Sequence, residues 1–528
     1  MKLVGGASGE PRWLNALAGA LMLGGPVWHY LYVNRYPFDR PEAIVLPLLG
    51  AVAGAALISL GRQLGGLVEV LIFGVVLFGF VDLQFDLDHY LPMVIIASGC
   101  LAIPSIVRTR RAVLTSITLG TFYLASIPRF GPQAPPTQAA TASEGAARPL
   151  LVHIILDGQW GIGGMRAEGD TATASFLTDF YLSRGFELYE AAYSRFARTQ
   201  ESIGSTVSLG APPVFHSPPA SPEEFSLRSI PYFERLRAMG YSIRVYQSTY
   251  LDFCHARSAP VASCETQKAN SIGNIGHVPG DWRVRGLIAG RYFINMTSHV
   301  YRRLHPDPDT WRRANLGGAL LAMQHASRDV ASGLPRNSAL FLHVIAPHRP
   351  IRVDADCRKL GDPPWRREDP PLTPMSDSAW RSLLDFEAGQ MRCVHRAVAD
   401  LVAAVDNSVG RDHSIIVIHG DHGVRRFQHP VASRAPALLD GRALNAQFST
   451  LLAVRRPGIP AALHGDAVPV QDFLRELVQH DFDGPTRGPF AHFVRGEPAD
   501  TLVRVLSISD MLWARAAPPA PVTSPSRR

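Results

Sequence analysis

The stretch Ile415-Ile-Val-Ile-His-Gly-Asp-His-Gly423 decides how this chain is interpreted. Its first half is a run of β-branched residues, which is typical of a buried strand. Its second half is a turn that carries a carboxylate and an imidazole side by side. Asp offers a hard oxygen ligand and His a nitrogen ligand, a combination that suits Zn²⁺ or Mn²⁺. The pattern therefore predicts that Asp421 and His422 bind a metal ion.

A second apolar strand, 150–156, ends in Asp157-Gly158, about 260 residues upstream of the first motif. Strands of an open α/β sheet present their chemistry at their carboxyl ends, so Asp157 can reach the same ion. A charged residue at the end of a buried strand needs a partner or a metal. The alternative is a turn aspartate that caps the next segment.

Thr199 lies where a strand ends and a Ser/Gly-rich helix begins. The N–H groups and dipole of a helix N-terminus favour a bound phosphate. A hydroxyl that is coordinated there by a divalent ion becomes a usable nucleophile. The alternatives are that Thr199 is only an N-cap, or that Ser202, Ser205 or Thr206 is the nucleophile.

Several histidines are candidates for proton transfer or for support of the ligands. His348 follows a strand end and His429 follows the Asp-His motif, so either could donate to a phosphate oxygen or protonate a leaving group. For each, the alternative is a surface-loop histidine. His153 and His343 lie within strands and are expected in the core or behind the ligands, and His419 could orient the ligands.

Strand-like and helix-like stretches alternate from residue 150 to 515, which predicts an α/β domain with a mainly parallel sheet between helices. The expected strands are 150–156, 186–193, 242–247, 339–345, 414–418 and 449–454. The expected helices are 171–184, one that begins near Ser202, 230–239 and 379–405. A Pro/Ala-rich linker, 129–149, precedes the domain, and the tail 516–528 is expected to be disordered.

Residues 1–128 are expected to form a transmembrane region of about five helices, because the apolar runs are long enough to cross ~30 Å of hydrocarbon. These runs are 13–33, 43–60, 67–81, 90–107 and 112–127. The arginines at 108–111 place the loop between the last two spans in the cytoplasm. Five crossings then put everything after residue 128 on the outer side of the membrane.

Four of the five cysteines fall in the exported part, and Cys100 falls in a span. An even number of cysteines in an oxidising compartment suggests two disulfides. The pairs nearest in sequence are Cys254 with Cys264 and Cys357 with Cys393, although four cysteines allow three pairings.

Asp157, Thr199 and Asp421-His422 occur in the order of the metal-site residues of the alkaline phosphatase/sulfatase superfamily. The Pro-His-Arg-Pro segment at 347–350 and the segment 451–458 also resemble that superfamily. The whole chain, with its spans and exported sulfatase-like domain, resembles lipoteichoic acid synthases and the lipid A phosphoethanolamine transferases.

The resemblance implies a metal-dependent transferase of the bacterial inner membrane with its catalytic domain in the periplasm. Thr199 would attack a membrane phospholipid, release diacylglycerol and pass phosphoethanolamine or phosphoglycerol to an envelope glycan or lipid. One divalent ion is implied, Zn²⁺ first and Mn²⁺ or Mg²⁺ as alternatives, with Asp157, Thr199, Asp421 and His422 as ligands. Thr199, His348 and His429 would be catalytic, and we expect a monomer.

Two positions depart from the family pattern. Relatives often carry Glu where this chain has Asp157. The Gly-Glu pair that often follows Asp-His-Gly is replaced by Val424-Arg425-Arg426. The two arginines favour a more anionic head group.

Other functions fit less well. A sulfatase needs a cysteine or serine in a Cys-x-Pro-x-Arg-like context, and no cysteine has one. A transporter would carry charged residues in mid-span. Despite the net charge of +7, there is no basic stripe with interleaved aromatics, so we expect no nucleic-acid partner. A membrane-anchored phosphodiesterase or a catalytically silent envelope-assembly protein remains as an alternative.

One arginine- and aromatic-rich segment, 282–304, could lie on the membrane interface and guide lipid donors. The alternative is a solvated helix face.

Overall fold

The computed structural model describes residues 12–33, 36–64, 68, 71–72, 148–210, 225–248, 250–254, 260–267, 281–297, 315–349, 351, 353–358, 376–424, 441–483, 490, 494–495 and 502–503. Contacts divide the chain into two compact units. One is Met1–Ala134 with Asn270–Ala314, and the other is Pro135–Ala269 with Asn315–Arg528. The chain therefore leaves the second unit after residue 269 and re-enters it at 315. The predicted bounds of the domain, 150–515, stay a prediction, and they include residues 270–314, which belong to the first unit.

The second unit is built on an eight-stranded sheet in the order β10-β2-β9-β8-β1-β7-β4-β6. Only β9 runs antiparallel to its neighbours, β2 and β8, among the pairings that the structure describes. The strands are β1 (Leu150–Leu156), β2 (Glu187–Tyr193), β4 (Ser242–Ser248), β6 (Ser263–Gln267), β7 (Ser338–Val344), β8 (Ser414–Gly420), β9 (Leu452–Arg455) and β10 (Ala462–Pro469). Two small sheets pair β3 (Phe225–Ser226) with β5 (Leu251–Asp252), and β11 (Val494–Arg495) with β12 (Leu502–Val503).

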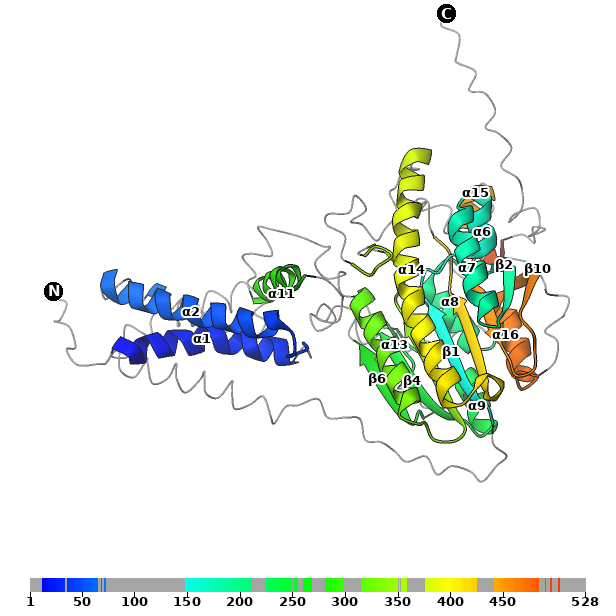
Figure 1. Cartoon of the computed structure of the whole chain (residues 1–528), viewed down its shortest axis with the longest axis horizontal. Helices are drawn as coiled ribbons and strands as arrows, with labels where there is room; N and C mark the ends of the chain where they lie inside the picture. Colours follow the sequence, from blue (N-terminus) through cyan, green and yellow to red (C-terminus); the bar gives the residue numbers. More distant parts are fainter. Residues whose placement is uncertain are drawn as a thin grey trace, which may run out of the picture. The chain divides into compact units, whose positions relative to one another are not determined.

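Helices cover both faces of the sheet, as a mainly parallel sheet requires. Side chains of α8 (Thr199–Val207), α9 (Pro231–Ala238) and α16 (Val470–Gln479) pack into a core with those of the central strands. Figure 1 shows α13 (Asn315–Ala331) and α14 (Asp377–Ser408) lying along the sheet in the same unit. The remaining elements of the unit are α6 (Ile162–Ala167), α7 (Thr171–Ser183), the 3₁₀ turn η2 (Arg411–His413) and α15 (Gly441–Phe448).

The central strands are buried along their whole length, which explains their unbroken apolar sequences. All seven residues of β1, β7 and β8 are buried. The predicted mainly parallel α/β domain is thus confirmed. Both predicted disulfides are present: Cys254–Cys264 with Cα atoms 6.0 Å apart, and Cys357–Cys393 with Cα atoms 5.0 Å apart.

The first unit contains α1 (Arg12–Val33), α2 (Pro41–Leu64) and α11 (Trp282–Thr297). Among the described residues, the segment Pro41–Gly61 alone is long and apolar enough to cross a membrane. The first predicted span is helical as well, since it coincides with α1. The last three predicted spans lie almost wholly outside the described residues, so the number five stays a prediction. Most of the linker and the whole tail also lie outside them.

Candidate metal centre

Two neighbouring parallel strands deliver the two predicted carboxylates to one place. Leu156 at the end of β1 is paired with Gly420 at the end of β8, so Asp157 and Asp421 follow side by side. Both side chains are buried, at 2% and 1% exposed. Asp421 Oδ1 accepts hydrogen bonds from the backbone N–H groups of Gly158 and His422, each at 2.8 Å. These two bonds fix the carboxylate plane and leave Oδ2 directed into the site.

The glycines around the Asp-His pair are required by close packing. A Cβ atom at Gly420 would lie 2.3 Å from Thr450 Oγ1, and one at Gly423 would lie 2.2 Å from the carbonyl oxygen of Ala446. Neither position has room for a side chain. The Gly-Asp-His-Gly motif therefore lets the strand end and its turn pass against the segment 446–450.

Thr199 is the first residue of α8, and its hydroxyl faces the carboxylates. Its Oγ1 lies 3.4 Å from both carboxylate oxygens of Asp157 and 3.3 Å from His422 Nε2. The side chain is buried, with 6% exposed. A phosphate next to this hydroxyl would also meet the positive end of the helix dipole.

The ring nitrogens of the two site histidines are oriented by backbone carbonyls. His422 Nδ1 donates to the carbonyl of Gly423 at 2.7 Å, and His348 Nδ1 donates to that of Arg349 at 2.6 Å. In each neutral ring the Nε2 lone pair then points to the carboxylates, which is the tautomer that a metal ligand needs. His348 Nε2 lies 4.0 Å from Asp157 Oδ1, and His422 Nε2 lies 3.9 Å from the same atom.

His348 was expected to handle protons rather than to bind metal. Ligand atoms of Asp157, His348 and His422 all lie within 4.8 Å of one another, a group that could hold a metal ion. The imidazole is 30% exposed, whereas Asp157 and His422 are buried. His348 therefore stands at the mouth of the site, where either role is available to it.

The surroundings shift the pKa values of the two carboxyl groups in opposite directions. Burial raises the pKa of Asp157, but His348, His343 and His422 outweigh it and lower that pKa to about 2. Burial and the charge of Asp157 raise the pKa of Asp421. Two adjacent buried carboxylates are unfavourable unless a cation joins them.

The donor set fits a divalent cation. Asp421 Oδ2 is buried, makes no hydrogen bond within the described residues, and lies 3.4 Å from His422 Nε2. Together with Asp157, Thr199 and His422 it offers carboxylate, hydroxyl and imidazole donors, which suit Zn²⁺ and Mn²⁺. A buried carboxylate oxygen without a hydrogen bond destabilises the fold unless it coordinates a cation.

Two hydrogen-bonded histidines, His153 on β1 and His419 on β8, join the two strands. His153 Nδ1 accepts from the Tyr232 hydroxyl at 2.9 Å, and His153 Nε2 donates to His419 Nε2 at 3.0 Å. His419 Nδ1 in turn donates to the carbonyl of Gly420 at 2.8 Å. Burial lowers the pKa of both histidines, so both rings stay neutral. The expectation that they support the site is consistent with these hydrogen bonds.

Two of the three alternative nucleophiles, Ser202 and Thr206, have other partners. Ser202 Oγ donates to the carbonyl of Asp421 at 2.6 Å, and Thr206 donates to the carbonyl of Ser202. Gln471 on α16 bonds Ser202 Oγ at 3.0 Å and Ser194 Oγ at 3.1 Å. Ser202 thus joins α8 to the Asp421 turn, which keeps Thr199 in register with the carboxylates. Sequence reasoning missed Gln471.

Tyr250 is a second residue that sequence reasoning missed. Its hydroxyl donates to Gln200 Oε1 at 2.7 Å, next to Thr199. Burial and the carboxylates of Asp157, Glu201 and Asp421 raise its pKa, so it remains a neutral phenol. It therefore lies next to the first turn of α8, which carries Thr199.

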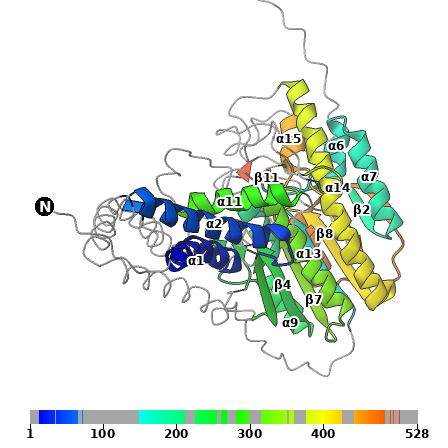
Figure 2. The ribbon, with the colours of Figure 1, turned by 60° about the vertical axis from the view of Figure 1, so that its left-hand side comes forward.

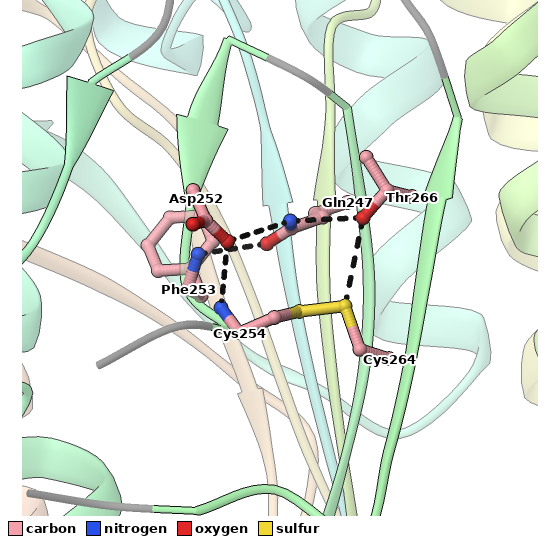
Figure 3. The surroundings of a disulfide bond; sticks show 6 residues. All are labelled: Gln247, Asp252, Phe253, Cys254, Cys264 and Thr266. Carbon is pink, nitrogen blue, oxygen red and sulfur yellow. Dashed lines mark hydrogen bonds between the residues drawn. A yellow bond between two sulfur atoms is a disulfide. The ribbon is translucent and has the colours of Figure 1, made fainter. Parts of the chain in front are cut away.

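The segment that follows Tyr250 is held by one of the disulfides (Figure 3). Gln247, at the end of β4, accepts from the Phe253 N–H at 2.8 Å and donates to Thr266 Oγ1 at 3.0 Å. The bond between Cys254 and Cys264 closes the same segment onto β6. This double attachment stabilises the part of the chain that carries Tyr250.

His429 and the pair Arg425-Arg426 lie outside the described residues, so their expected roles stay predictions. The remaining predicted residues, Asp157, Thr199, Asp421-His422 and His348, come together.

No protein-family model matches the chain, and no curated protein matches it. The similar solved structures include a zinc complex of the C-terminal periplasmic domain of EcEptC from Escherichia coli, with 10% identity, 72% of this chain and 99% of that chain covered, and a TM-score of 0.40. Phosphonate monoester hydrolase SpPMH from Silicibacter pomeroyi shows 14% identity, coverage of 63% and 73%, and a TM-score of 0.39. BT1596, a 2-O GAG sulfatase, shows 14% identity, coverage of 64% and 72%, and a TM-score of 0.39.

At such identities and TM-scores, function has to be argued from the residues of the site itself.

Proposed function

We propose that this protein transfers a phosphorylated head group, phosphoethanolamine or phosphoglycerol, from a membrane phospholipid to a glycan or lipid of the cell envelope. The observation that carries the proposal is the position of Thr199. Thr199 is the first residue of α8, and its Oγ1 lies 3.3–3.4 Å from the carboxylate oxygens of Asp157 and from His422 Nε2. The side chain is too buried to serve only as a surface cap. A hydroxyl in this setting is equipped to become a covalent nucleophile.

A divalent ion held by Asp157, Thr199, Asp421 and His422 would lower the pKa of the hydroxyl and offset the charge of the phosphoryl oxygens. In the first step Thr199 Oγ1 forms a bond to phosphorus, and the bond from phosphorus to the diacylglycerol oxygen breaks. The Thr199 proton moves toward the Asp157 carboxylate, 3.4 Å away. The departing oxygen takes a proton from Nε2 of His348, which therefore enters this step as the doubly protonated imidazolium and leaves it neutral.

The second step reverses these roles. Neutral His348 accepts a proton from the hydroxyl of the acceptor, whose oxygen attacks phosphorus. The bond from phosphorus to Thr199 Oγ1 breaks, and Thr199 regains its proton. In a hydrolase, water would replace the acceptor hydroxyl and every other step would be the same, which is why phosphodiesterase activity is the second candidate.

The donor and the location follow from the same proposal. Residues 1–128 would hold the protein in the inner membrane, with the catalytic unit on the periplasmic side and the phospholipid donor in the adjacent leaflet. We expect the protein to act as a monomer. Zn²⁺ is the metal that we expect, because the ligands combine imidazole with carboxylates.

The test is intact-peptide mass spectrometry on full-length protein purified from its native membrane. Trypsin should release residues 199–228 as one peptide, because Arg198 and Arg228 flank it without an internal Lys or Arg. The expected result is a phosphorylated head-group adduct that fragmentation locates on Thr199, and whose mass identifies the donor. Thr199→Ala should lose the adduct. Thr206→Ala, a change on the same helix and in the same peptide, should keep it.

Other outcomes separate the alternatives. An unmodified peptide in protein that contains metal and hydrolyses phosphodiesters would favour the hydrolase. An adduct on Ser202 or Thr206 would refute the assignment of the nucleophile. A protein with neither adduct nor metal would refute the proposal and leave a binding role in envelope assembly.

A further inference from the structure

The helix α11 belongs to the first unit although its sequence interrupts the second. It packs beside α2, as Figure 2 shows, and it lies between β6 and α13 in the chain. A helix of this size is only marginally stable alone, so contacts with the first unit must stabilise α11. The contacts are of three kinds: a buried ion pair, close helix packing and an aromatic pair.

The ion pair is the most specific of these contacts. Arg285 Nε donates to Glu42 Oε1 at 2.5 Å, and the Tyr36 hydroxyl donates to the same carboxylate oxygen at 2.9 Å. The two charged side chains are 8% and 1% exposed. Removing one partner of such a pair is strongly destabilising, since the other charge stays buried. Arg285 belongs to the segment 282–304, which was expected at the membrane interface, but its side chain joins α11 to α2.

Small residues let α11 approach α2 closely. A Cβ atom at Gly286 would lie 3.2 Å from Glu42 Cβ, and one at Gly290 would lie 3.6 Å from Leu46 Cδ2. Ala289, between them, is 1% exposed. Spacing of small residues by four positions is the usual device by which helices pack in membranes.

The same device joins α1 to α2. A Cβ atom at Gly54 would lie 2.0 Å from the carbonyl oxygen of Gly19. Tyr30 on α1 meets Phe293 on α11 with ring centroids 5.3 Å apart. All three helices thus form one closely packed body.

Part of the surface of α11 carries exposed apolar and basic side chains. Leu287 is 75% exposed, Trp282 is 37% exposed, and Arg283 lies over the Trp282 ring at 5.7 Å. An aromatic ring, a cation and a leucine on one short stretch are typical of a helix at the boundary between head groups and acyl chains.

The position of α11 along α2 shows what the exposed residues of α11 contact. Glu42 lies in the first turn of α2, and the candidate span begins at Pro41. The exposed apolar face of α2 starts at the same level, with Ile44 and Leu48 more than half exposed. A helix bonded to Glu42 therefore lies where the span meets the head groups.

We propose that α11 is an interfacial helix, held by the Glu42–Arg285 pair, whose Trp282, Arg283 and Leu287 contact the phospholipids of the leaflet into which α2 begins. The occupant of this surface is the bilayer itself, because Glu42, to which α11 is bonded, lies at the start of the candidate span. The proposal does not depend on the chemistry at Thr199, so it can fail or succeed independently of the proposed function.

The test measures the environment of position 287 in full-length protein. Leu287→Cys is made in a Cys100→Ala background, since the four other cysteines are paired in disulfides. The thiol carries an environment-sensitive fluorophore, and the protein is reconstituted into vesicles of phosphatidylethanolamine and phosphatidylglycerol. Leu463→Cys on β10, exposed to 41% and in the other unit, is the matched control. Neither change removes a buried side chain, so folding is not at stake.

Lipids with a nitroxide near the head group should quench the label at 287 about threefold or more above the label at 463, since interfacial helices sink only ~5–10 Å. Aqueous iodide should show the reverse order. Equal quenching at the two positions by both agents would overturn the proposal.

Charge variants test the tie. Glu42→Arg and Arg285→Glu should each move the 287 label from lipid quenching to iodide quenching, and the double exchange should restore the original pattern. If both single variants keep the label in the lipid, the holding role of the pair is refuted.

Discussion

Replacing Asp421 with asparagine should separate the contribution of this residue to metal binding from its effect on the stability of the metal-free protein. Asn would keep the Oδ1 atom that accepts from the N–H groups of Gly158 and His422 at 2.8 Å. Its amide nitrogen would replace Oδ2, a buried oxygen without a hydrogen bond among the described residues, 3.4 Å from His422 Nε2. The variant would thus lose a buried charge and gain a donor opposite an imidazole lone pair.

The expected magnitude follows from those contacts. A buried polar atom without a partner costs about 1–3 kcal/mol, so metal-free Asp421→Asn should be more stable than wild type by about 1–2 kcal/mol. Added Zn²⁺ should reverse the order. A ligand at a hundred times its Kd stabilises the native state by about 2.7 kcal/mol, and only the wild type should gain that amount.

Asp157→Asn is the matched control with the opposite sign. Neighbouring histidines lower the pKa of Asp157 from 3.8 to about 2, which corresponds to roughly 2 kcal/mol of stability. That contribution is present above pH 3.8 and is lost as the pH falls through about 2. At neutral pH the Asp157 variant should therefore be less stable than wild type without metal, and it too should gain little from Zn²⁺.

The assay is thermal unfolding of the full-length protein in detergent, followed by tryptophan fluorescence, after chelation and again with added Zn²⁺. Buried Trp160 and Trp380 report on the catalytic unit. If Asp421→Asn and Asp157→Asn lower the metal-free midpoint alike, the charge argument is wrong. If Zn²⁺ raises the midpoint of Asp421→Asn as much as that of wild type, Asp421 is not a ligand.

Three further predictions concern other residues of the second unit. His395 is buried with its pKa lowered to about 4, so stability should fall as the pH drops from 6.5 toward 4, and His395→Gln should remove roughly 3 kcal/mol of that pH dependence in urea unfolding. Cys254→Ser with Cys264→Ser opens a loop of 10 residues and should lower the free energy of unfolding by about 2–3 kcal/mol. The proposed head-group transfer should become slower, because the segment that carries Tyr250 is held less firmly. Activity equal to wild type would show that the segment needs no disulfide. Gln471→Leu should cost about 2 kcal/mol, while Gln471→Glu, which can still accept the backbone N–H now bonded to Oε1, should cost less; equal losses by urea unfolding would contradict this network.

Much of the site could be predicted because its signals are local. Each ligand-bearing turn directly follows an apolar strand, and the rule that parallel strands expose their carboxyl ends together then joins β1 to β8. The expected start of the helix near Ser202 was three residues late, since α8 begins at Thr199 itself. That difference improves the case for Thr199, because it places the hydroxyl in the first turn.

Other features had no local signal. Gln471 bonds Ser202 across 269 residues of sequence, and Arg285 finds Glu42 across 243 residues. Such pairs depend on how whole elements pack, which periodicity does not encode. The edge strand β10 was missed as well. Its sequence carries Gly, Asp and Pro and its outer residues are exposed, so it lacks the apolar run that marked the central strands.

The place of α11 in the first unit affects whether the second unit can be released from the cell by proteolysis. A single cut in the linker 129–149 would leave α11 on the released side of the break while its partners, α1 and α2, stay with the other fragment. The two fragments would remain joined by the Glu42–Arg285 pair and by the packing around Ala289. Release would expose a buried arginine together with a stripe of small residues, and a secreted fragment that starts near residue 150 would carry the same unmatched surface. Protease treatment of membranes should therefore nick this protein without solubilising it.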